Sequence, residues 1–133
     1  EEARRLAEQE ELERQARESG LPVTFTGALG HEDMPGLYRA HDVFAFTSTW
    51  EEPFGLTHLE AMASGAPVVS TTVGGQREFL RNGENALTVP PSDPAALADA
   101  IGRLVDDEGL RRGIAAAGRT TGRSTGRRER PGG

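Results

Sequence analysis

The sequence predicts an α/β domain in which helices cover both faces of a parallel sheet. Short apolar runs alternate with segments whose apolar residues recur at helical spacing, and the connections between them are short. This alternation is typical of right-handed βαβ units. The 133 residues suffice for one such domain but not for two. The expected strands are residues 23–26, 43–46, 67–70 and 86–89, and the expected helices are residues 34–40, 56–64, 76–80 and 94–105.

Residues 1–20 are expected to form a charged helix, or leader, that ends at Gly20. Glu and Arg alternate here with Ala and Leu, which are good helix formers, and Glu10 and Arg14 have the i,i+4 spacing of a helical ion pair. Only two leucines could anchor this helix to a core. We therefore expect a solvated surface helix outside the folded domain, which we assign to residues 21–118.

The last two expected helices differ in how they begin and end. The helix at 94–105 has two start signals: Ser92 or Asp93 can cap it, and Pro94 is well tolerated in a first turn. A shorter helix at 108–117 is expected to stop at Gly118.

Beyond Gly118 the chain is rich in Arg and Gly and carries nothing apolar to bury. Residues 119–133 are therefore expected to be a disordered tail. An Arg-rich tail can bind RNA or an anionic surface, but a solvated chain end is the favoured interpretation.

Composition excludes several classes of function. The formal charge of −6 argues against a nucleic-acid partner, which normally meets a basic surface. No apolar run approaches the roughly 20 residues that span a bilayer, so we expect a cytoplasmic protein without stable membrane insertion. The chain has no Cys, every basic side chain is Arg, and its three His are scattered, so no metal site is expected.

A candidate anion-binding site lies between the second expected strand and the next helix. Gly55 allows a ligand to approach the backbone, and the amides of residues 54–57 would lie at a helix N-terminus, which favours an anion. Glu52 and Glu60 could flank that anion. Carboxylates accept hydrogen bonds, which suits the hydroxyl groups of a ribose or a hexose.

Two structural alternatives remain open for these acids. Thr57 and Glu60 have the Ser/Thr-x-x-Glu spacing of a capping box, in which Glu60 would only close the helix end. Glu52, which precedes a proline, could equally be a solvated loop acid. Trp50 either borders the site or shields an exposed loop.

Residues 48–69 read Ser-x-x-x-Glu-x-Phe-Gly-Leu-x-x-x-Glu-Ala-Met-Ala-x-Gly-x-Pro-Val-Val. This run resembles the Glu-x7-Glu signature of the retaining GT-B glycosyltransferases, glycosyl transferases group 1. Five outlying segments agree with that family in order and spacing, so the resemblance covers residues 21–119. They are Val23-x-Phe25-x-Gly27, Ala40-His41-Asp42-Val43, Val73-Gly74-Gly75 with Glu78, Asn82-Gly83-x-Asn85 and Val89-Pro90-Pro91-x-Asp93.

The resemblance implies that the chain is the Rossmann-like C-terminal half of a GT-B architecture, which binds a nucleoside diphosphate sugar and needs no separate cofactor. Glu60 would then hydrogen-bond the ribose, and Glu52, the catalytic candidate, would contact the transferred sugar. The implied contacts with the rest of the donor are Phe54, Gly55, Leu56, Thr57, Gly74 and Gly75, with Gly27, Ala28 and Leu29 near the base.

The sequence also departs from the family pattern. An Arg and a Lys that usually hold the diphosphate would precede Glu1, and the chain has no Lys. We therefore expect a piece of a longer product that lacks its N-terminal acceptor-binding domain and has no turnover by itself. The main alternative is a truncated or inactive nucleotide-binding module, and a GT-B-type epimerase ranks below it.

Overall fold

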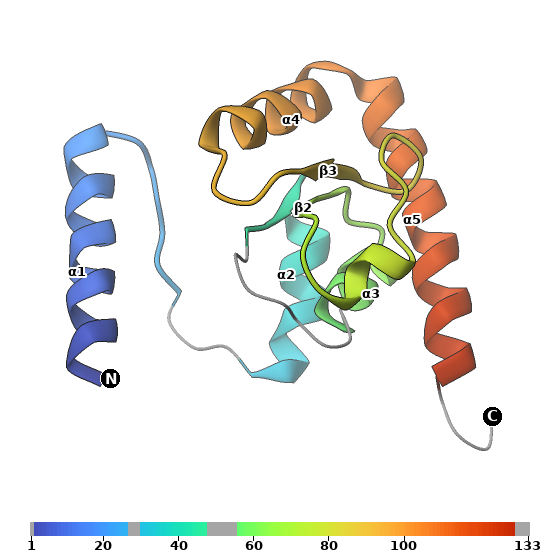
Figure 1. The fold of residues 1–133 in the computed structure, drawn as a ribbon, viewed down its shortest axis with the longest axis horizontal. Coiled ribbons are helices and arrows are strands. Elements are labelled where there is room, and N and C mark those ends of the chain that lie inside the picture. The colour runs from blue at the N-terminus through green and yellow to red at the C-terminus, as the bar shows by residue number, and fades with distance from the viewer. Residues whose placement is uncertain (1, 27–29, 48–55, 130–133) are drawn as a thin grey trace. The chain divides into compact units, whose positions relative to one another are not determined.

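The computed structural model describes residues 2–26, 30–47 and 56–129 of the chain (Figure 1). The chain divides into two compact units, Glu1–His31 and Glu32–Gly133. Within the described residues, no helix combines the length and the apolar composition needed to cross a bilayer.

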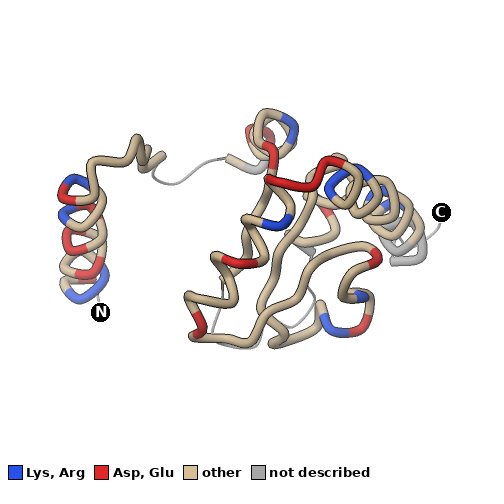
Figure 2. The backbone as a smooth tube through the Cα atoms, turned by 90° about the horizontal axis from the view of Figure 1, so that it is seen from above, with Lys and Arg blue, Asp and Glu red and all other residues tan. Residues whose placement is uncertain are grey.

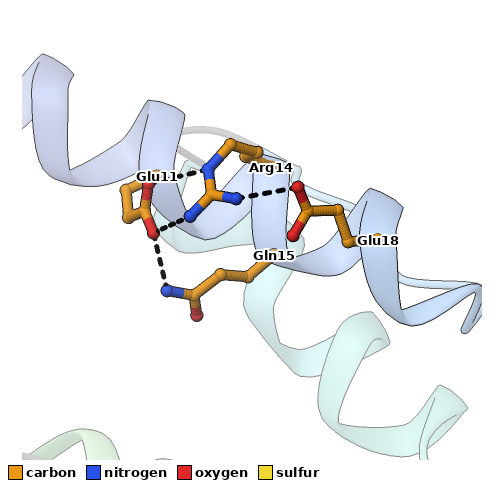
Figure 3. Close-up of polar contacts among 4 residues, drawn as sticks. All are labelled: Glu11, Arg14, Gln15 and Glu18. Carbon is orange, nitrogen blue, oxygen red and sulfur yellow. Dashed lines mark hydrogen bonds and ion pairs between the residues drawn. The ribbon is translucent and has the colours of Figure 1, made fainter.

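The first unit contains helix α1 (Glu2–Ser19), which buries none of its residues. Charges of both signs follow one another along it (Figure 2). The expected charged helix is present, and it ends directly before Gly20. The expected pairing of Arg14 with Glu10 is wrong, because the guanidinium group of Arg14 bonds Glu11 one turn before it and Glu18 one turn after it (Figure 3).

The expected strand at residues 23–26 is also wrong, since these residues belong to no strand. The amide of Val23 donates instead to the carbonyl of Leu21, at 2.9 Å, which forms a local turn. Val23 and Phe25 keep 52% and 44% of their surface exposed. A strand needs a neighbour to bond its backbone groups, and the described part of the chain provides none for this segment.

The second unit alternates helices and strands as the sequence predicts (Figure 1). After a 3₁₀ turn, η1 (His31–Asp33), its elements are α2 (Met34–Ala40), β1 (Phe44–Phe46), α3 (Leu56–Ala63), β2 (Val68–Thr71), η2 (Gly75–Glu78), β3 (Leu87–Val89), α4 (Pro94–Asp106) and α5 (Glu108–Glu129). Where a helix was expected at 76–80, the chain forms only the short 3₁₀ helix η2.

The three strands form a parallel sheet in the order β1-β2-β3. In its register Phe46 lies opposite Ser70, and Val69 lies opposite Leu87. Every residue of the central strand β2 is buried. The parallel pairing of both neighbours with β2 confirms the predicted parallel sheet.

Successive side chains of β2 enter two separate cores, as the alternation along a strand requires. Val68 packs into a cluster with Tyr38 of α2 and Met62 of α3. Val69 packs into a second cluster with Leu104 of α4 and Ile114 of α5. Helices therefore cover both faces of the sheet, and the predicted α/β fold is confirmed.

Helix α4 begins as predicted. The side chain of Asp93 accepts a hydrogen bond from the amide of Ala96 at 3.0 Å, so of the two predicted caps it is Asp93 that serves. The neighbouring Ser92 has a positive φ of 57° instead.

Helix α5 continues past Gly118 to Glu129, so both the predicted helix end and the predicted disorder from residue 119 are wrong over that stretch. The reason is close packing of α5 against α3, which requires residues without side chains. A Cβ on Gly122 would lie 2.5 Å from the amide nitrogen of Ala63, and one on Gly118 would lie 3.2 Å from the carbonyl oxygen of Asn85. The side-chain amide of Asn85 also donates to Thr121, at 3.1 Å.

Candidate functional site

The N-terminus of α3 lies where the sequence predicts an anion-binding site. Leu56 and Thr57 are the first two residues of this helix, and Thr57 is exposed. The first four amides of a helix have no acceptor within it, and the helix dipole places partial positive charge there. The described part of the predicted site can therefore receive an anion.

The capping-box interpretation of Thr57 and Glu60 does not fit this helix. A capping residue stands before the first helical residue, with its partner three positions later. Thr57 instead follows Leu56 inside the helix, and Glu60 lies in its second turn. The positions of Thr57 and Glu60 on α3 therefore do not match those of a capping box.

Glu60 is half-buried, and its negative charge acts on the phenol of Tyr38 in α2. Burial raises the pKa of Tyr38 above its ordinary value of 10.0, and the charge of Glu60 raises that pKa further. Only 1% of Tyr38 is exposed, and its hydroxyl group has no hydrogen-bond partner among the described residues. A buried hydroxyl group therefore lies within the electrostatic reach of the carboxylate that was predicted to bind ribose.

This arrangement predicts an alkaline loss of stability. The chain has one Tyr and no Lys or Cys, so Tyr38 is the only side chain expected to titrate near pH 10. Because its pKa is raised in the folded state, the free energy of unfolding should be constant below Tyr's ordinary pKa and fall as the pH rises toward the raised value. Denaturant titrations across this pH range measure the fall.

The control for this prediction is Tyr38→Phe, which should abolish the alkaline fall. At neutral pH the same variant should be more stable by about 1 kcal/mol, because it removes a buried hydroxyl group that lacks a partner. A fall in stability that persists in Tyr38→Phe would mean that another group titrates.

A glycine turn follows the carboxyl end of β2. Gly74 has φ 87° and ψ −163°, which residues with side chains rarely adopt, and it precedes η2. The carbonyl of Gly74 accepts from the backbone amide of Arg77 at 3.3 Å and from its Nε at 3.2 Å. Arg77 therefore closes the turn that was predicted to lie across the donor.

Both parts of the predicted site lie at one edge of the sheet. The chain leaves β1 at Phe46 toward α3, and it leaves β2 at Thr71 toward Gly74. Because the register pairs Phe46 with Ser70, these two strand ends are neighbours. Ligands of open parallel sheets bind beyond the carboxyl ends of the strands, and Thr57, Glu60 and the glycine turn all follow those ends.

A buried polar contact joins α3 to the carboxyl end of β2, and the sequence alone did not predict it. His58, which the sequence analysis considered only as a metal ligand, is 0% exposed, and its Nε2 lies 2.8 Å from Oγ of Ser70. Its ring stacks on Phe46, with centroids 3.8 Å apart. No spacing in the sequence links His58 with Ser70, because their contact depends on how α3 packs on β2.

The remaining predicted site residues, Gly27, Ala28, Leu29, Glu52, Phe54 and Gly55, lie outside the described residues, as does Trp50. Leu56 is described as part of α3 only by its backbone. Among the described residues no group of three or more His, Asp or Glu could hold a metal ion.

The fold is that of the C-terminal half of a GT-B architecture. The family model of glycosyl transferases group 1 matches residues 3–107. The chain belongs to this family.

Relatives and solved structures agree with this assignment. D-inositol 3-phosphate glycosyltransferase of Corynebacterium jeikeium is 42% identical over 106 residues, which are 78% of this chain and 25% of the relative. A structure of Anabaena HepE in complex with UDP and glucose has a TM-score of 0.80 at 34% identity, over 86% of this chain and 31% of that one. The C-terminal domain of the group 1 protein LpcC from Francisella tularensis has a TM-score of 0.79 at 32% identity, over 91% of this chain and 63% of that domain.

The chain thus spans about a quarter of the length of the curated relatives it matches, 25% and 24% for two of them. These relatives are named as glycosyltransferases, and they contain much that this chain does not.

Proposed function

We propose that the chain is the donor-binding part of a retaining glycosyltransferase, which transfers a sugar from a nucleoside diphosphate sugar to an acceptor bound by another domain. One observation carries the proposal. The N-terminus of α3 and the Gly74–Gly75 turn follow the carboxyl ends of two neighbouring parallel strands. Membership of the family and the UDP and glucose held by HepE support the same function.

In this proposal each part of the site has one task. The amides of Phe54, Gly55, Leu56 and Thr57 hold the diphosphate, since unbonded N–H groups and the helix dipole favour its charge. Glu60 accepts hydrogen bonds from ribose hydroxyl groups, and Glu52 accepts them from the sugar. Gly74 and Gly75 approach the donor through their backbone, and residues 27–29 lie near the base.

The reaction then needs no protein nucleophile and no separate cofactor. The bond between the anomeric carbon and the diphosphate oxygen breaks, the oxygen of the acceptor hydroxyl group bonds the same carbon on the same face, and the proton of that hydroxyl group passes to the leaving diphosphate. The site stabilises the positive charge that develops on the sugar and the negative charge on the leaving diphosphate. The two acids therefore do not act as the paired carboxylates of a glycosidase. We further propose that the protein acts in the cytoplasm and without nucleic acid.

The second candidate is a nucleotide-binding module without catalysis. It is favoured by the absence of Lys, because a cationic partner for the diphosphate is then limited to Arg.

Calorimetry of the 133-residue chain with UDP, GDP and UDP-glucose tests the proposal. We expect one nucleoside diphosphate to bind, and its sugar nucleotide to bind more tightly, because Glu52 adds contacts with the sugar. A parallel assay of these 133 residues with radiolabelled donor should show no release of sugar, because the proposed transfer needs a second, acceptor-binding domain and 133 residues suffice for one domain only.

Equal affinity for the plain nucleotide and for its sugar nucleotide would favour the module. If neither nucleoside diphosphate nor UDP-glucose binds at millimolar concentration, the proposed function is wrong for these donors.

A further inference from the structure

We propose that His58, Ser70 and Gln76 are positioning residues, which hold the first turn of α3 and the Gly74–Gly75 turn in register through a buried chain of hydrogen bonds. The inference rests on the proposed function, because these two segments form the donor site. All three side chains are buried in the second unit, with 0% of each residue exposed. They therefore act through their neighbours Thr57, Glu60 and Gly75.

The first link of this chain joins α3 to the carboxyl end of β2. Nε2 of His58 lies 2.8 Å from Oγ of Ser70, and the imidazole ring stacks on Phe46 of β1 with an interplanar angle of 23°. His58 stands between Thr57 and Glu60 on α3. A rotation or shift of this helix would break the hydrogen bond and the stacking together.

The direction of the first hydrogen bond follows from the second. Oγ of Ser70 lies 3.0 Å from the backbone carbonyl oxygen of Thr71, which can only accept, so the single hydroxyl proton of Ser70 is donated there. Ser70 must then accept from His58. The geometry thus places a proton on Nε2 of His58.

The third link reaches the glycine turn. Nε2 of Gln76 donates to the same carbonyl oxygen of Thr71 at 3.2 Å. A carbonyl oxygen has two lone pairs and can accept both bonds. Gln76 follows Gly75 directly, so its bond to this carbonyl fixes the position of the glycine turn. Through Ser70 and His58 the same carbonyl fixes the position of α3, which carries Glu60.

Apolar side chains alone could hold α3 against β2 and the glycine turn. The presence of buried polar side chains at this contact therefore indicates that they fix how these segments are placed. Burying a hydrogen-bond donor costs free energy unless it meets an acceptor, and a misaligned arrangement would leave Nε2 of His58 and Nε2 of Gln76 without the acceptors they have here. A buried hydrogen-bond network therefore favours one placement of α3 relative to the glycine turn over placements that are slightly shifted or rotated.

The test compares two substitutions of His58. In His58→Gln, the side-chain nitrogen lies as many bonds from Cα as Nε2 of the imidazole and can still donate to Ser70. His58→Leu removes the donor. We expect His58→Leu to weaken UDP binding by about fivefold, the effect of one lost hydrogen bond, and His58→Gln to restore most of that loss. Ser70→Ala, a smaller change, should weaken UDP binding to a similar extent as His58→Leu.

Ile114→Val is the matched control. It removes one methyl group from the other core and should lower stability by an amount measurable in denaturant without changing UDP affinity. If Ile114→Val weakens UDP binding as much as His58→Leu does, or if His58→Gln binds no better than His58→Leu, the positioning role is excluded.

Two NMR readouts test the chain of hydrogen bonds without any ligand. The imidazole nitrogen shifts of His58 should show a proton on Nε2, and the amides of Gly74 and Gly75 should shift in Ser70→Ala. A proton found only on Nδ1, or amides of the turn that do not change, would overturn the inference. Failure of the wild-type chain to bind UDP would count against the proposed function, while these two readouts would still decide whether the hydrogen-bond chain exists.

Discussion

Replacing Gly122 with alanine is expected to destabilise the second unit by about 1–3 kcal/mol, the usual cost of overpacking. The new Cβ would lie 2.5 Å from the amide nitrogen of Ala63 and 2.8 Å from the carbonyl oxygen of Leu59. Both contacts are with the backbone of α3, which cannot rotate away as a side chain could. Helix α5 would have to separate from α3, which carries Glu60.

Gly113→Ala is the matched control, in the same helix and with the same chemical change. Gly113 is exposed, and a Cβ there meets nothing within 4 Å. Alanine should therefore stabilise the chain by about 0.5–1 kcal/mol through its higher helix propensity. Denaturant unfolding of both variants measures the difference. Two variants that change stability in the same direction would mean that α5 does not pack on α3 at Gly122.

Glu60→Gln is expected to weaken binding of the nucleoside diphosphate by about 1–3 kcal/mol, the range for a hydrogen bond to a charged group. The amide keeps the size of the side chain but loses the charge and half of the acceptors. Calorimetry with wild type and variant measures the loss, and circular dichroism checks that the helix content is constant.

Two further variants make this result specific to the site. Glu52→Gln should chiefly reduce the preference for the sugar nucleotide over the plain nucleotide, because Glu52 is assigned to the sugar. Glu84→Gln removes an equal charge from an exposed loop and should leave both affinities unchanged. Wild-type affinity in Glu60→Gln would remove the assignment of Glu60 to the ribose.

The sequence predicts the sheet of the second unit well because burial dictates its residue types. Val68 and Val69 face opposite cores, so both must be apolar, and this pair after Pro67 is visible without a structure. The start of α4 is equally local, because Asp93 caps a helix only three residues away. The position of Thr57 and Glu60 on α3 follows from the spacing of apolar residues in the same way.

Features that depend on distant partners could not be predicted. Residues 23–26 alternate like a strand, but pairing needs a second strand that the described residues do not supply. Glycine weakens a helix in isolation, so Gly118 suggested an end. In the structure the backbone of α3 leaves no room for a Cβ at Gly122, and the carbonyl oxygen of Asn85 lies close to the position of one at Gly118. The hydrogen bond between His58 and Ser70 exists only because α3 packs on β2.

The most direct test of the donor site is an NMR titration of the ¹⁵N-labelled chain with UDP. The account predicts that the amides of Leu56, Thr57, Gly74 and Gly75 shift together and saturate at one dissociation constant, while exposed amides of α4 such as that of Asp99 stay in place. Shifts confined to other parts of the chain, with α3 and the glycine turn unchanged at saturation, would contradict it.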